Sequence, residues 1–276
     1  MITTHRYLLG CVFILVLLGS AGCVSAPEIE KHQFTERYYT YSILLAPEKL
    51  GNSPQLDLSL ALLRMEYPED QVEALHNMLY GQTNVDVYRD MVLSEQRKNY
   101  RDKAADMLVK SDPLNFNWRY AEKFRIKQIH ELGIVIERVL ETPFGAANPG
   151  KITQYYNIEI IEHEYKLLTL DDFFEDFHEN AQCRDIVYAE LRKYSKLESA
   201  QPLSQGIYYN NQPELTFNFF ITDDGLGLNW DPAQIAPHSH GSIQIILPWH
   251  ILSPLMLHSG SAILAKYDID LSHSEE

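Results

Sequence analysis

Cysteine is scarce in this sequence of 276 residues, with three in all. Cys11 lies inside an apolar N-terminal run, Cys23 follows that run, and Cys183 stands alone in the remainder of the chain. A disulfide framework and a cysteine-lined metal cage are therefore excluded. Stability must come from a packed core, which a 45% content of hydrophobic residues can supply.

Long hydrophobic runs are also rare. The N-terminal run, Leu8 to Leu18, is too short to cross the ~30 Å of bilayer hydrocarbon as a helix. Arg6 precedes it and the small residues at 19–22 follow it, a pattern typical of an export signal. Small residues ending in Cys23 resemble the lipobox of bacterial lipoproteins, although Ser20 departs from the usual leucine.

The lipobox resemblance implies that residues 1–22 are a signal peptide and that Cys23 is acylated. Residues 23–35 would then form a lipidated tether, and several acyl chains anchor stably because each buried CH2 contributes about 0.8 kcal/mol. We expect a lipid-anchored protein of the bacterial cell envelope, in the outer or the cell membrane, facing the periplasm or the exterior. An ordinary signal peptide with a chance cysteine is the alternative.

Positive charge is in deficit, since 23 Lys and Arg residues stand against 38 Asp and Glu residues, a formal net charge of −15. So acidic a chain argues against nucleic acid and anionic lipid as partners. It favours cationic partners, because opposite charges accelerate association. The plainer interpretation is that acidity keeps an exported protein soluble.

Motifs of catalysis are missing as well. The chain has no G-x-S-x-G nucleophile elbow, and the loop from Gly145 to Gly150 lacks the Lys-Ser pair and helix of a phosphate loop. Acidic residues around His163 and at Asp171–Asp172 fit a turn and a helix start better than an acid–base pair. Cys183 fits a small apolar residue inside a helix. We therefore assign no catalytic residue and no cofactor, and an enzyme is the less favoured interpretation.

Strand and helix patterns are interspersed along the chain. Alternating or β-branched residues predict strands at 37–46, 56–65, 117–128, 131–140, 152–162, 215–222 and 242–247. Capping residues and apolar stripes predict helices at 68–80, 84–108, from 170, at 180–196 and at 248–255. The order lacks the strict alternation of a parallel sheet, so we predict an α+β fold, mostly antiparallel sheet with packed helices.

The segment LTFNFFITDDGLGLNWDPAQIAPHSHGSIQIILPWHIL, with Ile235-Ala236-Pro237, Gly241 and Pro248 at matching spacing, resembles the RsiV-type domain. That domain occurs in lysozyme-sensing anti-sigma factors and in bacterial lipoproteins. KLLTLDDFFEDF at 166–177 resembles the helix start of the same family. The resemblance implies an RsiV-type α+β domain at 151–266 and a PdaC-like α+β domain at 36–150, followed by an acidic, frayed tail at 267–276.

The sequence also departs from that family. It shows no sigma-binding segment and no membrane-spanning helix ahead of the domain, so we do not expect sigma-factor release. His238 replaces the usual loop aromatic, and Asn148 stands where the PdaC-like G-G-A-H motif has histidine. A polysaccharide deacetylase sometimes accompanies this domain, yet its metal motif is absent here.

His238 and His240 are the clearest candidates for metal ligands. On an extended segment they lie on one side, about 6.6 Å apart, and His250, His258 or His163 could complete a zinc site. The fixed ligand spacing of a recognisable zinc site is missing, however. We favour a structural role in which Pro237 fixes a turn and Gly241 allows an unusual φ, and we predict no metal.

The favoured function is a binding module of the cell envelope that recognises a lysozyme-like cationic muramidase or peptidoglycan. The predicted binding residues are Asp223, Asp224, Asn229, Trp230, Asp231 and His238, which the sequence places in one hairpin and the loop after it. A buried Trp230 is the alternative for that residue. The alternative functions are a metal-dependent hydrolase or deacetylase accessory, and a structural lipoprotein without a small ligand.

Overall fold

The computed structural model describes residues 33–44, 55–67, 69–109, 118–130, 132–142, 150–161, 164–269 and 271. The signal peptide, Cys23, most of the tether, the Gly145–Asn148 loop and His163 lie outside these residues. Within the described part, the strands form a six-stranded and a three-stranded sheet, and helices pack on both. The predicted α+β class is confirmed, and no helix of the described part is long and apolar enough to cross a membrane.

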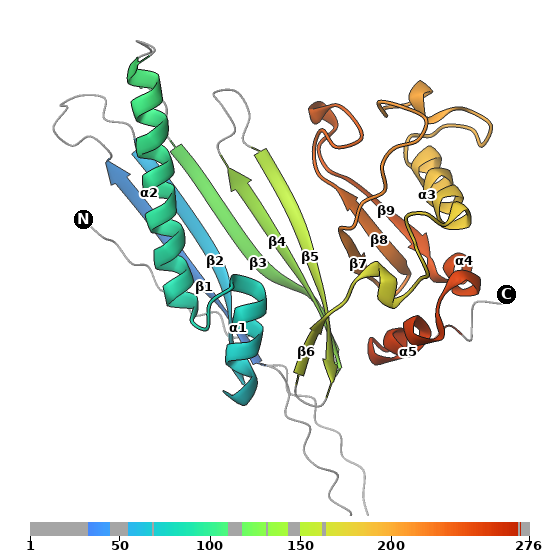
Figure 1. Ribbon diagram of the computed structural model, residues 1–276, viewed down its shortest axis with the longest axis horizontal. Coiled ribbons are helices and arrows are strands. Elements are labelled where there is room, and N and C mark those ends of the chain that lie inside the picture. The colour runs from blue at the N-terminus through green and yellow to red at the C-terminus, as the bar shows by residue number, and fades with distance from the viewer. Residues whose placement is uncertain are drawn as a thin grey trace, which may run out of the picture.

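The first sheet has the strand order β1-β2-β3-β4-β5-β6 (Figure 1). Every neighbouring pair is antiparallel except β2 and β3, which run parallel and are joined through two helices. The strands are β1 (Gln33–Leu44), β2 (Gln55–Tyr67), β3 (Trp118–Ile129), β4 (Gly133–Thr142), β5 (Gly150–Ile161) and β6 (Glu164–Leu167), and the helices are α1 (Val72–Tyr80) and α2 (Val85–Val109).

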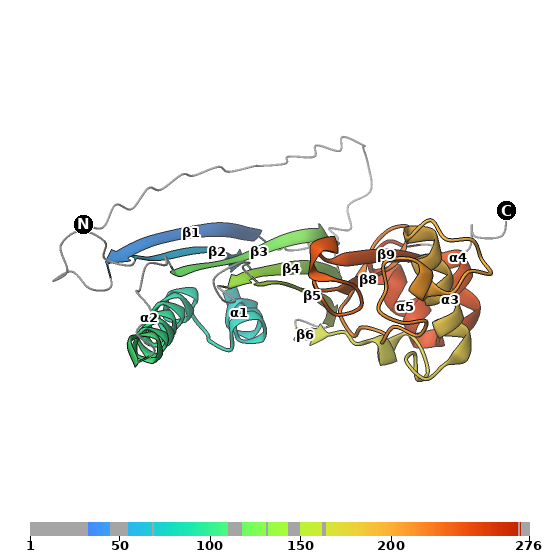
Figure 2. The same ribbon diagram turned by 90° about the horizontal axis from the view of Figure 1, so that it is seen from above.

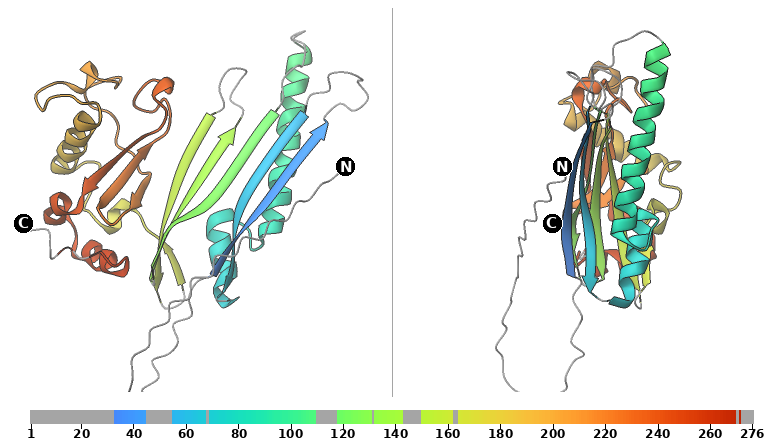
Figure 3. Two further views of the ribbon diagram at one scale, coloured as in Figure 1. Left: turned by 180° about the vertical axis from the view of Figure 1, so that it is seen from behind. Right: turned by 90° about the vertical axis from the view of Figure 1, so that its left-hand side faces the viewer.

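Helices α1 and α2 cover one face of this sheet (Figures 2 and 3). The alternating leucines of β2 (56, 58, 60, 62) are buried, and the last three share a core with Tyr88 and Val92 of α2. Asn84 begins α2 as predicted, because its side chain accepts a hydrogen bond from the N–H of Asp86 at 2.7 Å. Gly81 ends α1 at φ +63°, a conformation that favours glycine.

The second unit is built around a sheet of order β7-β8-β9, all antiparallel. Its elements are β7 (Phe219–Ile221), β8 (Gly225–Trp230), β9 (Ile243–Pro248), α3 (Ala181–Tyr194), α4 (Trp249–Leu252) and α5 (His258–Lys266). Two helical segments of this unit begin at residues whose side chains cap them. Thr169 forms a capping box with Asp172, and Asn180 accepts hydrogen bonds from the N–H groups of Gln182 and Cys183.

Two expected boundaries differ from the structure. The boundary at residue 150 falls between β4 and β5, which pair along ten residues of one sheet, so the first unit continues through β6. The tail expected from residue 267 begins with a fully buried Tyr267, whose hydroxyl donates to the carbonyl of Ile158 at 2.7 Å. The ring of Tyr267 packs against Gly133, and this contact fixes the start of the segment. The acidic composition of the segment does not reveal such a contact.

The two sheets are joined by asparagine side chains. The amide of Asn157 on β5 donates to the carbonyl of Phe219 at 2.7 Å and accepts from the N–H of Ile221 at 3.0 Å. Asn218 does the reverse, accepting from the N–H of Tyr155 and donating to the carbonyl of Thr153. Each side chain thus replaces a neighbouring strand, and the buried backbone groups of β5 and β7 are satisfied where no ladder continues.

Replacement of Asn157 by alanine leaves the N–H of Ile221 and the carbonyl of Phe219 buried without these partners. We expect the free energy of unfolding to fall by about 2–4 kcal/mol, measured by urea unfolding of the folded chain. Asn99→Ala, at an exposed position of α2, is the control and should change stability by less than ~0.5 kcal/mol. Equal midpoints for the two variants would contradict this role of Asn157.

Candidate functional site

The six predicted binding residues do not form one patch. Asp223 and Asp224 are exposed in the turn between β7 and β8, whereas Asp231 and His238 follow the other end of β8. A strand of six residues separates the two groups by roughly 20 Å. The expected cluster is therefore corrected to two separate places, one at each end of the second sheet.

Asn229 and Trp230 are buried within β8 and present no side-chain surface for a ligand in this structure. The indole N–H of Trp230 donates to the carbonyl of Glu214 at 2.8 Å, and its ring belongs to the core of the second unit. Trp230 is therefore a buried core residue, which was the alternative prediction for it. Strand β8 is buried because it lies between β7 and β9, and because its side chains share a core with those of α3.

A chain of hydrogen bonds crosses the corner between the sheets and contains two of the predicted residues. Gln244 of β9 donates to the hydroxyl of Tyr155 at 2.8 Å and to the side-chain oxygen of Asn229 at 2.9 Å. Tyr155 donates to Glu137 at 2.9 Å, and Arg125 also pairs with Glu137. The side-chain amide of Asn229 donates to the carboxylate of Asp231 at 3.5 Å, and this is the last hydrogen bond of the series.

The electrostatics of this corner favour a framework of fixed polar groups. Burial, reinforced by the neighbouring Glu137 carboxylate, raises the pKa of Tyr155 well above its ordinary value, so its hydroxyl stays protonated and donates. Burial also raises the pKa of Asp231, against the opposing effect of the Thr153 N–H, which donates to it at 2.8 Å. Each group is held by neighbours, which fits orientation of the sheets better than proton transfer.

Sequence patterns did not indicate Glu137, Tyr155 and Gln244 as a group. They lie on three strands and meet only because β5 contacts the second unit. One signal was present in the sequence: Glu137 interrupts the apolar run Ile134–Ile136 of a strand, and a carboxylate buried there needs partners. Its partners could not be identified before the fold was known.

The two histidines lie on the surface loop before β9. His238 and His240 are exposed in a single 3-10 turn, whose Gly241 has φ +71°. Pro237 accepts the N–H of His240 through its carbonyl, which agrees with the predicted turn. Across the described residues, no three His, Cys, Asp or Glu side chains gather as metal ligands do.

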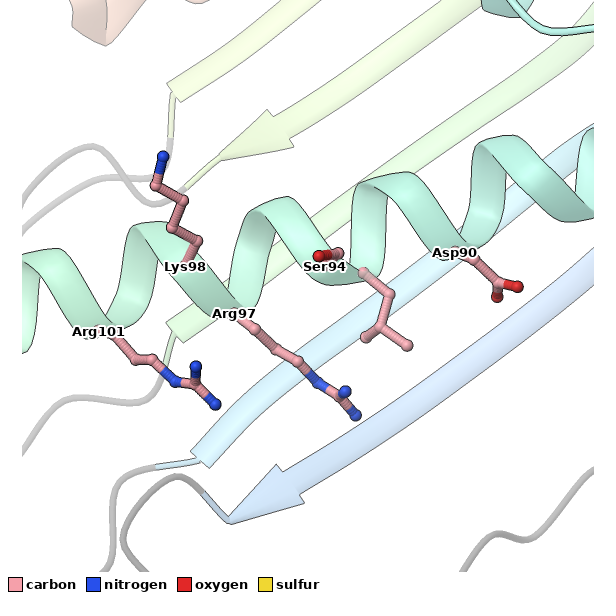
Figure 4. A pocket seen from close by; sticks show the side chains of 6 residues that line it. Asp90, Ser94, Arg97, Lys98 and Arg101 are labelled. Atoms are coloured by element: carbon pink, nitrogen blue, oxygen red, sulfur yellow. The ribbon is translucent and has the colours of Figure 1, made fainter.

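A separate concavity of about 490 Å³ runs along the exposed side of α2, far from the predicted residues. Figure 4 shows Arg97 and Arg101 extending to the same side of the helix, while Lys98 extends to the other side. Its described lining comes from α2 alone: Asp90, Leu93, Ser94, Arg97, Lys98 and Arg101. A lining from one helix gives a ligand few fixed contacts.

Comparisons with known proteins give a match to a family model within the second unit and a similar fold for both units. Residues 171–250 match the model of the DUF3298 family, described as a protein of unknown function. A DUF3298 family protein of Bacteroides fragilis superimposes with a TM-score of 0.71 at 16% identity, covering 86% of this chain and 98% of that one. A Pseudomonas aeruginosa DUF3298 protein gives 0.53 at 17% identity, covering 83% and 96%. No curated protein matches the sequence.

Cys183 is buried at the start of α3, as expected for a small apolar residue, and burial raises the pKa of its thiol to about 11. Because the pKa is about 8.5 in an unfolded chain, the folded state holds this proton more firmly. The associated stability is complete below about pH 8.5 and is lost as the pH rises towards 11.

We expect Cys183 to resist Ellman's reagent at pH 8 in the folded chain and to react fully in urea, with Cys11 and Cys23 replaced by serine. A cysteine at the exposed Ser204 position (S204C) is the control and should react at once in the folded state. Equal reaction rates at positions 183 and 204 would show that Cys183 is accessible.

Proposed function

We propose that this protein is a lipid-anchored binding module of the bacterial cell envelope, whose acidic second unit binds cationic proteins. A lysozyme-like muramidase is the leading ligand, as the RsiV-type resemblance of the closing segment suggests. Residues 171–250 match a family without a known role, so the ligand class rests on charge and on that resemblance.

The distribution of charge is the observation that carries the proposal. Residues 168–271 contain 14 Asp and Glu against 5 Lys and Arg, a net charge of −9, whereas residues 33–167 contain 20 against 16, a net charge of −4. In the second unit, ten carboxylates are exposed among the described residues: Asp171, Glu175, Asp176, Glu179, Asp185, Glu198, Glu214, Asp223, Asp224 and Asp268. Such a field attracts cations and steers their approach.

The anchor is supported by the first 23 residues. An apolar run of signal-peptide length ends in small residues and Cys23, and the first described strand begins ten residues later. Acyl chains on Cys23 would hold the folded units close to a membrane surface. A binding protein held there meets its ligand in the envelope, where cationic muramidases act on peptidoglycan.

Reversal of the exposed acidic turn, Asp223→Lys with Asp224→Lys, should weaken binding of hen lysozyme about tenfold or more at 50 mM salt, measured by calorimetry. The matched control is Glu73→Lys with Glu141→Lys, two exposed positions of the first unit. Both double variants carry the same net charge. Equal weakening would show that only net charge matters, and no binding by the wild-type chain would refute the proposed ligand.

Cys23→Ser should release the protein from membranes. We expect the wild-type chain to remain in the membrane fraction of the expressing bacterium after high-salt washing and to carry a diacylglyceryl mass on Cys23. The variant should lack that mass and lose most of its membrane association, since one covalent anchor is removed. An unmodified wild-type Cys23 in soluble fractions would refute the anchor.

A further inference from the structure

Exposed aliphatic side chains gather at one end of the first sheet. Ile129 and Leu132 flank the turn from β3 to β4, and Ile161 precedes the adjacent turn from β5 to β6; their exposed fractions are 47%, 40% and 40%. The two turns are neighbours, because the N–H of Ile160 donates to the carbonyl of Leu132 at 3.0 Å. Leu167, 44% exposed, adds apolar surface on β6.

Local backbone features place these residues outward. A bulge between Ile126 and Gln128 shifts the register, so that Gln128 pairs with Val135 and Ile129 with Ile134. Gln128 then reaches the second unit, donating to Asp223, while Ile129 remains on the surface. In the turn, the N–H of His130 donates to the carbonyl of Gly133, which sets Leu132 at the tip.

The proposed anchor enters the fold at the same end. Gln33, the first residue of β1, pairs with Tyr67 at the end of β2, and β2 runs parallel to β3, which ends at Ile129. Gln33 lies ten positions after Cys23, and ten residue steps of extended chain span at most about 36 Å. Strands β1 and β4 lie only roughly 15 Å apart across the sheet. An acyl anchor therefore keeps the two turns within reach of the bilayer.

Charge near these turns selects the type of lipid. Asp268 contacts His130 at 3.1 Å, the exposed Asp223 accepts a hydrogen bond from Gln128, and the exposed Glu164 pairs with Ile161 across the turn from β5 to β6. Carboxylates at this position repel anionic headgroups but not zwitterionic ones. Aliphatic tips flanked by carboxylates fit a zwitterionic surface, where the tips enter the interface and the carboxylates stay in water.

We propose that this end of the sheet, with Ile129, Leu132 and Ile161, docks on a zwitterionic phospholipid bilayer and orients the anchored protein. The docking rests on the proposed Cys23 anchor, which supplies the high local concentration that three side chains need. It fixes the far end of the sheet, including the start of β5, away from the membrane.

The test compares two positions of one strand. Ile161 and Ile152 are 40% and 39% exposed and lie nine residues apart on β5, roughly 30 Å. Each is replaced by cysteine (I161C, I152C) in the acylated full chain and labelled with a small fluorophore, while buried Cys183 stays unlabelled. In vesicles of phosphatidylethanolamine and phosphatidylcholine with nitroxide lipids, we expect at least about threefold stronger quenching at position 161.

A matched pair of double substitutions distinguishes an effect of Ile129 and Leu132 from a general loss of exposed hydrophobic surface. Ile129→Ser with Leu132→Ser should remove most quenching at position 161, whereas Met91→Ser with Ile246→Ser, at positions of similar exposure elsewhere, should leave it unchanged. Equal quenching at positions 161 and 152 on vesicles that carry the protein overturns the docking and leaves the anchor intact. Failure of the acylated chain to float with vesicles refutes the anchor, and the docking with it.

Discussion

Asn157 offers its side-chain amide to β7 where an adjacent strand would offer a backbone N–H and carbonyl. The side chain thus satisfies buried backbone groups of β7 where the ladder of the first sheet does not continue. Asn218 supplies the reciprocal bonds to β5. With the two sheets held in this way, Val135 and Tyr155 of the first sheet complete the core of the second unit. The hydrogen-bonded corner around Glu137 depends on the same junction.

Local signals in the sequence were sufficient for most elements. The alternating leucines of β2 and the capping residues Asn84, Thr169 and Asn180 act within a few residues of where they stand, so their effects follow from sequence alone. Helix α5 and strand β6 were missed. Both are short, and they depend on tertiary contacts such as that of Tyr267 with Gly133. A local sequence pattern carries no information about such contacts.

Strand β8 shows why the predicted binding residues do not lie together. Its sequence GLGLNW carries two glycines, which ordinarily weaken a strand. A side chain at position 227 would overlap the ring of Phe220, so glycine is what permits this ring to lie between the sheets beside Tyr155. The segment is therefore a buried central strand. Residues that looked adjacent along the hairpin became separated by the length of that strand, and those within it became part of the core.

The difference in charge between the two units has a structural origin. Strand β3 carries cations at alternate positions, and those of Arg125 and Lys127 lie against the buried carboxylate of Glu137. Acidic residues of the first unit are thus balanced close to where they stand, and little long-range field remains. The second unit has fewer cations: Lys193 pairs with Glu190 within it, and Lys166 of β6 pairs with Asp172. Its exposed carboxylates are left to act together, so the negative electrostatic field comes mainly from this unit.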